Sequence, residues 1–216
     1  IVGAYNDDEG GFTDSGSATL FKRNITTHAW ELQGKFVNEN QASLDNFGYD
    51  VSISGDYAIV GAFKDDENGK TNNGSATIFK RNTMTNIWES QGKLLNNNPQ
   101  NGDWFGYSVS ISGDYAIVGA RYDDEGGFTD SGSATIFKRN TITNDWESQG
   151  TLINYMPQNL DYFGYDVSIS EDYAIVGAYN DDEGGFTDSG SATLFKRNIT
   201  THAWELQGKF VNENQA

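Results

Sequence analysis

The sequence predicts an all-β protein, a β-propeller built of four-stranded antiparallel blades. Three observations carry this prediction: a repeat of 58 residues runs through the whole chain, each repeat holds four strand-like segments, and no segment shows helical spacing. Phe-Gly-Tyr and Gly-Ser-Ala-Thr recur at the same interval as Ile-Val-Gly-Ala. The last of these begins at Ile1, Ile59, Ile117 and Ile175.

The repeat divides the 216 residues into three full blades, 43–100, 101–158 and 159–216, preceded by a partial blade, 1–42, with only the second to fourth strands. Residues 1–42 and 175–216 are identical at every position, whereas neighbouring units differ at many. We therefore expect a window of a longer periodic array or a chain that assembles with its copies. The missing first strand would come from the other chain end or from another copy.

Each strand of the unit 43–100 has its own pattern. Residues 47–54 alternate large apolar with small or polar residues, which is typical of a half-buried strand, and residues 57–62 form the continuous apolar run of a strand buried on both faces. Gly55-Asp56 between them predicts a two-residue type II′ turn, which needs glycine first. The third strand is expected over 74–81 and the fourth over about 87–95.

The composition excludes several classes of function. The formal net charge of −17 disfavours nucleic acids and anionic lipid surfaces as partners. Without cysteine, the chain has no disulfide, cysteine-based zinc site or thiol nucleophile. Its two histidines, His28 and His202, are copies of one position, which argues against a His-rich metal site or a Ser-His-Asp triad. No apolar run approaches the roughly 18 residues of a membrane span, so membrane insertion is not expected.

The run from Phe47 to Ala62, followed by an Asp/Gly-rich loop and by Gly-Ser-Ala-Thr-Ile-Phe from Gly74, resembles the FG-GAP repeat, the blade of the integrin alpha-subunit propeller. The resemblance covers every unit and is greatest to the form found in bacterial and other large extracellular proteins. It implies blades around a central axis in secreted or surface proteins that bind or adhere. The integrin-type calcium loop between the first two strands is absent, because a turn such as Gly55-Asp56 is too short to supply the oxygens that calcium needs.

A different acidic loop follows the second strand of every unit. Its carboxylates and glycines could wrap a hard cation, which makes calcium the one cofactor hypothesis. Asp, Asn and Gly are also the residues that solvated turns favour, so a plain turn is the alternative. The candidate calcium ligands are Asp7, Asp8, Glu9, Asp14, Asp65, Asp66, Glu67, Asp123, Asp124, Glu125, Asp130, Asp181, Asp182, Glu183 and Asp188.

Aromatic residues and sequons supply the remaining candidates. One tryptophan per unit lies in the fourth strand and is expected to pack one blade against the next: Trp30, Trp88, Trp146 and Trp204. Trp104 and Tyr162 stand at a position that varies between units, and we expect them at a loop rim where they could contact a partner. If the protein is eukaryotic and secreted, Asn24, Asn73 and Asn198 are glycosylation sites. Basic pairs such as Lys80-Arg81 are expected to be salt-bridged or solvated.

Together these features predict a non-enzymatic, extracellular or cell-surface propeller for adhesion, binding or structural assembly, with a filament as one form of that assembly. Its partners would be its own copies or further repeats, or a protein or glycan ligand. The alternative is a calcium-dependent carbohydrate-binding propeller, a lectin. A hydrolase is disfavoured because every unit repeats the same Asp-Asp-Glu, so no carboxylate pair is set apart for catalysis.

Overall fold

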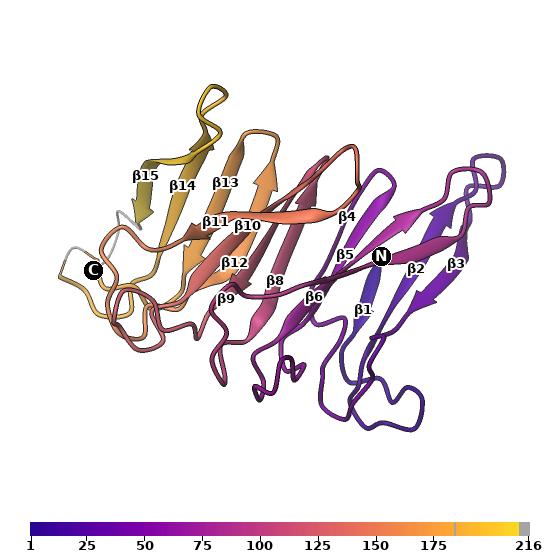
Figure 1. Ribbon diagram of the computed structural model, residues 1–216, viewed down its shortest axis with the longest axis horizontal. Coiled ribbons are helices and arrows are strands. Elements are labelled where there is room, and N and C mark those ends of the chain that lie inside the picture. Colours follow the sequence, from indigo (N-terminus) through magenta and orange to yellow (C-terminus); the bar gives the residue numbers. More distant parts are fainter. Residues whose placement is uncertain (184, 212–216) are drawn as a thin grey trace.

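The computed structural model describes residues 1–183 and 185–211. These residues form fifteen strands in four separate antiparallel sheets. The sheets stand side by side in chain order, from the N-terminal sheet at one end to the C-terminal sheet at the other (Figure 1). The prediction of an all-β chain of four-stranded blades is confirmed, with the first blade three-stranded. The described part of the chain contains no helix that could cross a membrane.

Within each blade the strands pair with their neighbours in sequence. The first blade comprises β1 (Val2–Ala4), β2 (Ser17–Arg23) and β3 (Trp30–Phe36). The second comprises β4 (Val51–Ser54), β5 (Tyr57–Ala62), β6 (Ser75–Arg81) and β7 (Trp88–Leu94). The third comprises β8 (Phe105–Ser112), β9 (Tyr115–Ala120), β10 (Ser133–Arg139) and β11 (Trp146–Leu152). The fourth comprises β12 (Phe163–Ser170), β13 (Tyr173–Ala178), β14 (Ser191–Arg197) and β15 (Trp204–Val211).

The turn between the first two strands has the expected geometry. Gly55 has a φ of +58° and Asp56 a negative φ, as a type II′ turn requires. In the fourth blade Glu171 takes the glycine position with a φ of +52°, a conformation that side chains seldom adopt. β4 begins at Val51 rather than at Phe47, so the predicted first strand is too long in this blade.

Consecutive blades are joined by the same backbone contact at each junction. Gly74 forms a parallel bridge with Phe105 of the next blade, and Gly16–Phe47 and Gly132–Phe163 repeat it. Glycine is required there because a Cβ on Gly74 would lie 2.0 Å from the carbonyl oxygen of Phe105. The Gly-Ser-Ala-Thr and Phe-Gly-Tyr motifs therefore recur because they meet across the junction.

The hydrophobic core lies between blades rather than within them. At the junction of the second and third blades, Ile59, Ile78 and Leu94 of one blade pack against Phe105 and Phe137 of the next. Equivalent clusters fill the other two junctions.

The fourth-strand tryptophans follow the same logic. Trp146 packs on Tyr57 of the preceding blade, with ring centroids 5.9 Å apart, and Trp204 packs on Tyr115 in the same way. Trp88 packs on Phe36 of the preceding blade instead. The prediction is confirmed for these three and is wrong for Trp30. It lies in the first sheet of the described chain, where no other blade packs on it, and it is 69% exposed.

Candidate functional site

The acidic loop encloses a lysine in three of the four blades. In the second blade the Nζ of Lys93 lies 2.6 Å from Asp65 Oδ2 and also contacts Glu67. Burial alone would lower the pKa of Lys93, but its hydrogen bonds with Asp65 and Glu67 outweigh burial and raise that pKa. The ammonium group of Lys93 therefore lies between the carboxylates of the loop. Equivalent groups are Lys35 with Asp7 and Glu9, and Lys209 with Asp181 and Glu183.

The second aspartate of each loop has a different role, because it holds the loop backbone. Asp124 Oδ1 accepts a hydrogen bond from the Asp130 backbone N–H at 2.8 Å, and Asp66 accepts one from Asn72 at 2.7 Å. The pairs Asp8–Asp14 and Asp182–Asp188 repeat this bond. Over residues 1–183 and 185–211, no group of three or more acidic or histidine side chains is arranged to hold a metal ion. Calcium binding at these loops stays a prediction.

The third blade departs from its sisters, because Thr151 stands where they have lysine. Asp123 is 1% exposed and accepts hydrogen bonds from Ser133 Oγ at 2.6 Å and Asn96 Nδ2 at 3.2 Å. Asn96 Nδ2 also lies 3.2 Å from Asp103 Oδ2, so one amide bridges two carboxyl groups. Burial, helped by neighbouring carboxylates, raises the pKa of Asp103 to about 7 and that of Asp123 to about 6.

The three sequons lie in two different settings. Asn24 and Asn198 are half-buried in the β2–β3 and β14–β15 loops, where Asn24 Oδ1 accepts a hydrogen bond from the Thr26 N–H at 2.8 Å. Asn73 is 1% exposed, and its Oδ1 accepts a hydrogen bond from the Glu67 N–H at 2.8 Å. The folded loop therefore leaves no room for a glycan at Asn73, whereas Asn24 and Asn198 stay candidates.

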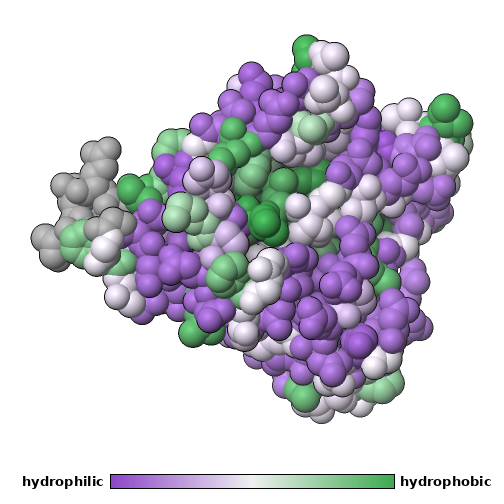
Figure 2. All heavy atoms as spheres, turned by 60° about the vertical axis from the view of Figure 1, so that its left-hand side comes forward, coloured by the Kyte–Doolittle hydropathy of each residue, from purple (hydrophilic) through white to green (hydrophobic). Residues whose placement is uncertain are grey.

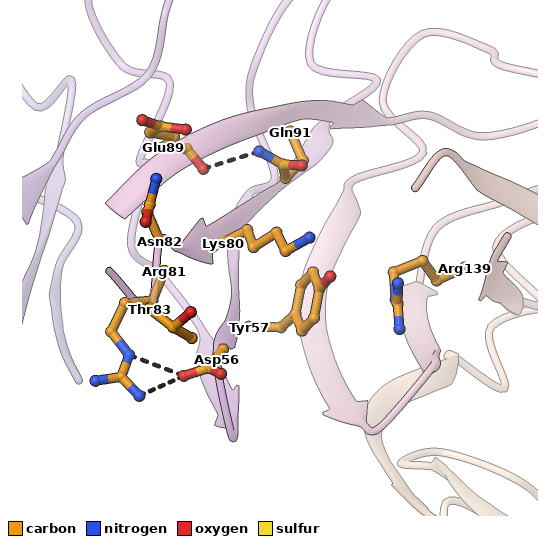
Figure 3. A pocket seen from close by; sticks show the side chains of 9 residues that line it. All are labelled: Asp56, Tyr57, Lys80, Arg81, Asn82, Thr83, Glu89, Gln91 and Arg139. Atoms are coloured by element: carbon orange, nitrogen blue, oxygen red, sulfur yellow. Dashed lines mark hydrogen bonds and ion pairs between the residues drawn. The ribbon is translucent and has the colours of Figure 1, made fainter. Parts of the chain in front are cut away.

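A polar groove of about 550 Å³ is lined by residues of the second blade and by Arg139 of the third (Figure 3). Arg81 Nε donates to Asp56 at 2.8 Å, and Arg139 of the next blade reaches the ring of Tyr57, 5.0 Å from its centroid. Similar grooves open at the other blades. The arginines at the ends of the third strands are thus ion-paired in the second to fourth blades, as predicted for these basic pairs.

Trp104, a predicted partner contact, belongs to an aromatic cluster at the junction of the second and third blades. The guanidinium carbon of Arg121 lies 4.7 Å from the centroid of Trp104, 4.1 Å from that of Tyr107 and 4.4 Å from that of Tyr122. Arg121 also donates hydrogen bonds to the hydroxyls of Tyr107, at 3.2 Å, and Tyr122, at 2.9 Å. We call these four residues the rim cluster. Tyr162, the other predicted contact, lies beside it with its ring 5.2 Å from that of Tyr122.

A row of tyrosines continues the rim cluster across the blades. Tyr49, Tyr107 and Tyr165 come from the Phe-Gly-Tyr motifs of consecutive blades, and their ring centroids are 4.8 Å and 5.4 Å apart. Tyr107 is 8% exposed, whereas Arg121, Trp104 and Tyr122 are half-buried. The sequence patterns did not predict this gathering. The signal for it was Arg121 itself, at a position that is aromatic in the other units.

The profile of the FG-GAP repeat matches residues 30–79, 88–137 and 146–195, which together make up more than half of the chain. The chain belongs to the FG-GAP repeat family. Each matched segment begins at the tryptophan of one blade and ends in the third strand of the next, so each spans one blade junction. No curated protein matches the sequence.

Among solved structures, the FG-GAP chain is similar to the crystal structure of a protein from Lactobacillus plantarum. The TM-score is 0.56 and the sequence identity 14%, over 90% of this chain and 50% of that chain. At this identity the likeness shows the fold alone. The described chain thus spans half the length of that protein.

Proposed function

We propose that this FG-GAP repeat protein is a non-enzymatic, extracellular or cell-surface protein whose end blades join further copies, for adhesion or structural assembly. One observation carries the proposal: the two end blades expose the same positions that the inner blades bury against a neighbour. The family resemblance supports the extracellular setting, and the sameness of the loops from blade to blade supports a role other than catalysis.

The first blade exposes the face that the later blades bury. Phe21 is 39% exposed, whereas Phe79 and Phe137, at the equivalent positions, are 6% and 4% exposed. Val2 is 57% exposed, and its equivalent Val60 is fully buried. A blade placed on this face would bury the same kind of apolar surface that joins the inner blades.

The fourth blade exposes the opposite half of the same interface. Ile175 is 38% exposed and Phe210 is 55% exposed, whereas their equivalents Ile59 and Phe36 are 0% and 5% exposed. Seen with the C-terminal side brought forward, apolar surface lies in the middle of the molecule between polar arms (Figure 2). The ends are therefore two halves of one interface, which is the geometry of head-to-tail association.

The inner junctions also show which polar contacts a second copy would add. Arg139 and Trp146 both lie against the ring of Tyr57 in the preceding blade. At the open C-terminal face the equivalent Tyr173 is 45% exposed. In a second copy, Arg23 and Trp30 stand at the positions of Arg139 and Trp146. We therefore assign the open face to a second copy of this chain, with Tyr173 meeting Arg23 and Trp30.

The native mass of the purified chain, measured by light scattering over a range of concentrations, tests the proposal. We expect dimers, rings or longer chains for the wild type, and monomers for Phe21→Asp and for Ile175→Asp. Ile142→Asp is the matched control, since Ile142 is 89% exposed on a loop away from both faces, and it should assemble like the wild type. A wild-type chain that stays monomeric at about 100 μM would refute the proposal, because this concentration is well above the dissociation constants typical of specific interfaces.

Removal of calcium, followed by the native mass and by the melting temperature, distinguishes the alternative, a calcium-dependent lectin. A lysine already pairs with two carboxylates in the acidic loops of three blades, so we expect neither the mass nor the melting temperature to change when calcium is replaced by a chelator. A rise of several degrees in melting temperature with calcium would favour the lectin instead.

A further inference from the structure

We propose that the rim cluster at the junction of the second and third blades binds a carboxylate-bearing saccharide. In this arrangement Arg121 holds the carboxylate and Trp104 packs against the sugar ring. The inference rests on the rim cluster alone and does not depend on blade assembly.

Arg121 is a cation without a carboxylate partner. Arg81, Arg139 and Arg197 each pair with the aspartate of the turn in their own blade. Across residues 1–183 and 185–211, no carboxylate oxygen lies within 4.0 Å of Arg121, whose side-chain hydrogen bonds go to two tyrosine hydroxyls. Its Nε is buried and has no acceptor among these residues. Beyond the two N–H groups that bond the tyrosines, the terminal nitrogens of Arg121 carry further N–H donors, and among the described residues no carboxylate within 4.0 Å pairs with its charge.

A second cation lies beside Trp104. The Nζ of Lys64 is 5.2 Å from the ring centroid of Phe63 and 6.0 Å from that of Trp104. In the described part of the chain, no carboxylate oxygen lies within 4.0 Å of Lys64, whereas Lys35, Lys93 and Lys209 each have two. Two cations around one tryptophan make a local positive site on a protein whose net charge is −17. The positive charge of this site attracts an anionic ligand.

Trp104 provides a fixed apolar platform. Its ring is held by Phe63 and Tyr122, with centroids 4.7 Å and 4.5 Å away, and it remains half-buried rather than enclosed. Its backbone N–H is bonded to the Asn72 carbonyl oxygen, which ties the loop to the third strand region of the preceding blade. A rigid aromatic surface next to a forked cation suits a ring-shaped ligand that carries one carboxylate.

Arg121 and Trp104 are departures from the repeat. The position of Arg121 holds Tyr5, Phe63 and Tyr179 in the other units, and the position of Trp104 holds Asn46 and Tyr162. The sister blades fold with these neutral residues, so the fold does not require arginine or tryptophan here. A singular combination on a repeated scaffold is where a specific ligand would be recognised.

Isothermal titration calorimetry with trigalacturonic acid tests the site, with galactotriose as the neutral sugar and hexaglutamate as the anion without a sugar. We expect the acidic trisaccharide to bind, and Arg121→Tyr, which restores a sister residue, to weaken binding at least about tenfold. Trp104→Asn should weaken it about fivefold or more by removing the platform. Lys70→Gln removes one positive charge from an exposed loop residue and should leave affinity within about twofold.

Four outcomes would overturn the proposal. Equal binding of galactotriose would remove the role of the carboxylate, and equal binding of hexaglutamate would make the site a general anion or peptide site. No heat with trigalacturonic acid at millimolar concentration, or unchanged affinity in Arg121→Tyr, would remove the site altogether. Circular dichroism of the variants shows that they fold, so loss of binding cannot be attributed to unfolding.

Discussion

The inner junctions and the open ends of this molecule use the same residues in different surroundings. At Gly61 an added Cβ would lie 2.0 Å from the carbonyl oxygen of Gly106 in the next blade. At Gly177, the equivalent position in the last blade, the nearest atom is 3.7 Å away. The same contrast holds for Phe79 against Phe21.

The contrast shows that the repeated motifs encode a junction rather than a blade. These glycines and large apolar residues add little to the stability of a single sheet, because they are exposed unless another blade packs against them. This is the behaviour of a repeat whose units are stabilised mainly by their neighbours. Substitutions at matched positions separate the contribution of the junction from that of the blade.

The largest expected difference is at the phenylalanine that recurs in the third strand of every blade. Phe79 stacks on Phe36 of the preceding blade at 4.1 Å, so Phe79→Ala should lower the free energy of unfolding by about 3–5 kcal/mol. Phe21→Ala at the open face should cost less than about 1 kcal/mol, because Phe21 is already 39% exposed. Urea denaturation at low protein concentration, where the chain is monomeric, measures both. Equal losses would mean that blades are stabilised from within.

The junction glycines give the next largest effect. Gly74 and Gly190 have similar positive φ angles, +82° and +72°, so an alanine is strained at both. Only at Gly74 would the new Cβ meet the next blade, 2.0 Å from a carbonyl oxygen; at Gly190 the nearest atom is 3.0 Å away. We expect Gly74→Ala to cost about 2–3 kcal/mol more than Gly190→Ala. If thermal melts show the same loss for both, backbone strain alone explains these glycines.

The sequence determined most of this fold because period and alternation depend on local chemistry. Four strands per unit, the turn at Gly55 and the packing of Trp88 on the preceding blade follow from spacing, turn preference and size. The exposure of Trp30 could not be predicted from its own unit, because the burial of this tryptophan depends on whether another blade packs against it.

The candidate sites were less predictable because they depend on contacts between distant residues. The acidic loops indicated a cation, but Lys93, which reaches Asp65 from the fourth strand, lies 28 positions further along the chain. Arg121 could be identified as a candidate binding residue only from the structure, which places Trp104 and Tyr107 around it. The repeat therefore predicts the blade fold, whereas the candidate binding site depends on residues that differ from the repeat.

The smallest expected effect concerns the polar part of a closed junction, and it depends on pH. Asn96 of the second blade bridges Asp103 and Asp123 of the third, whose pKa values burial raises to about 7 and about 6. In the unfolded chain both carboxyls titrate near their ordinary pKa of 3.8. The folded state therefore holds these protons more tightly, so their contribution to stability is complete below about pH 4 and is lost as the pH rises through 6 to 7.

Thr151→Lys would place a lysine near Asp103 and Asp123, at the position where the other blades have lysine. It should stabilise the chain by on the order of 1–2 kcal/mol at pH 8, where the carboxylates are ionised, and by much less at pH 4.5. Lys93→Thr is the reciprocal control, and it should destabilise the second blade most at pH 8, since it leaves Asp65 and Glu67 without their cation. Chemical denaturation at the two pH values measures both variants. A Thr151→Lys gain that is equal at pH 4.5 and pH 8 would show that the lysine acts through packing rather than through charge, and the closed junctions would then owe their stability to apolar contact alone.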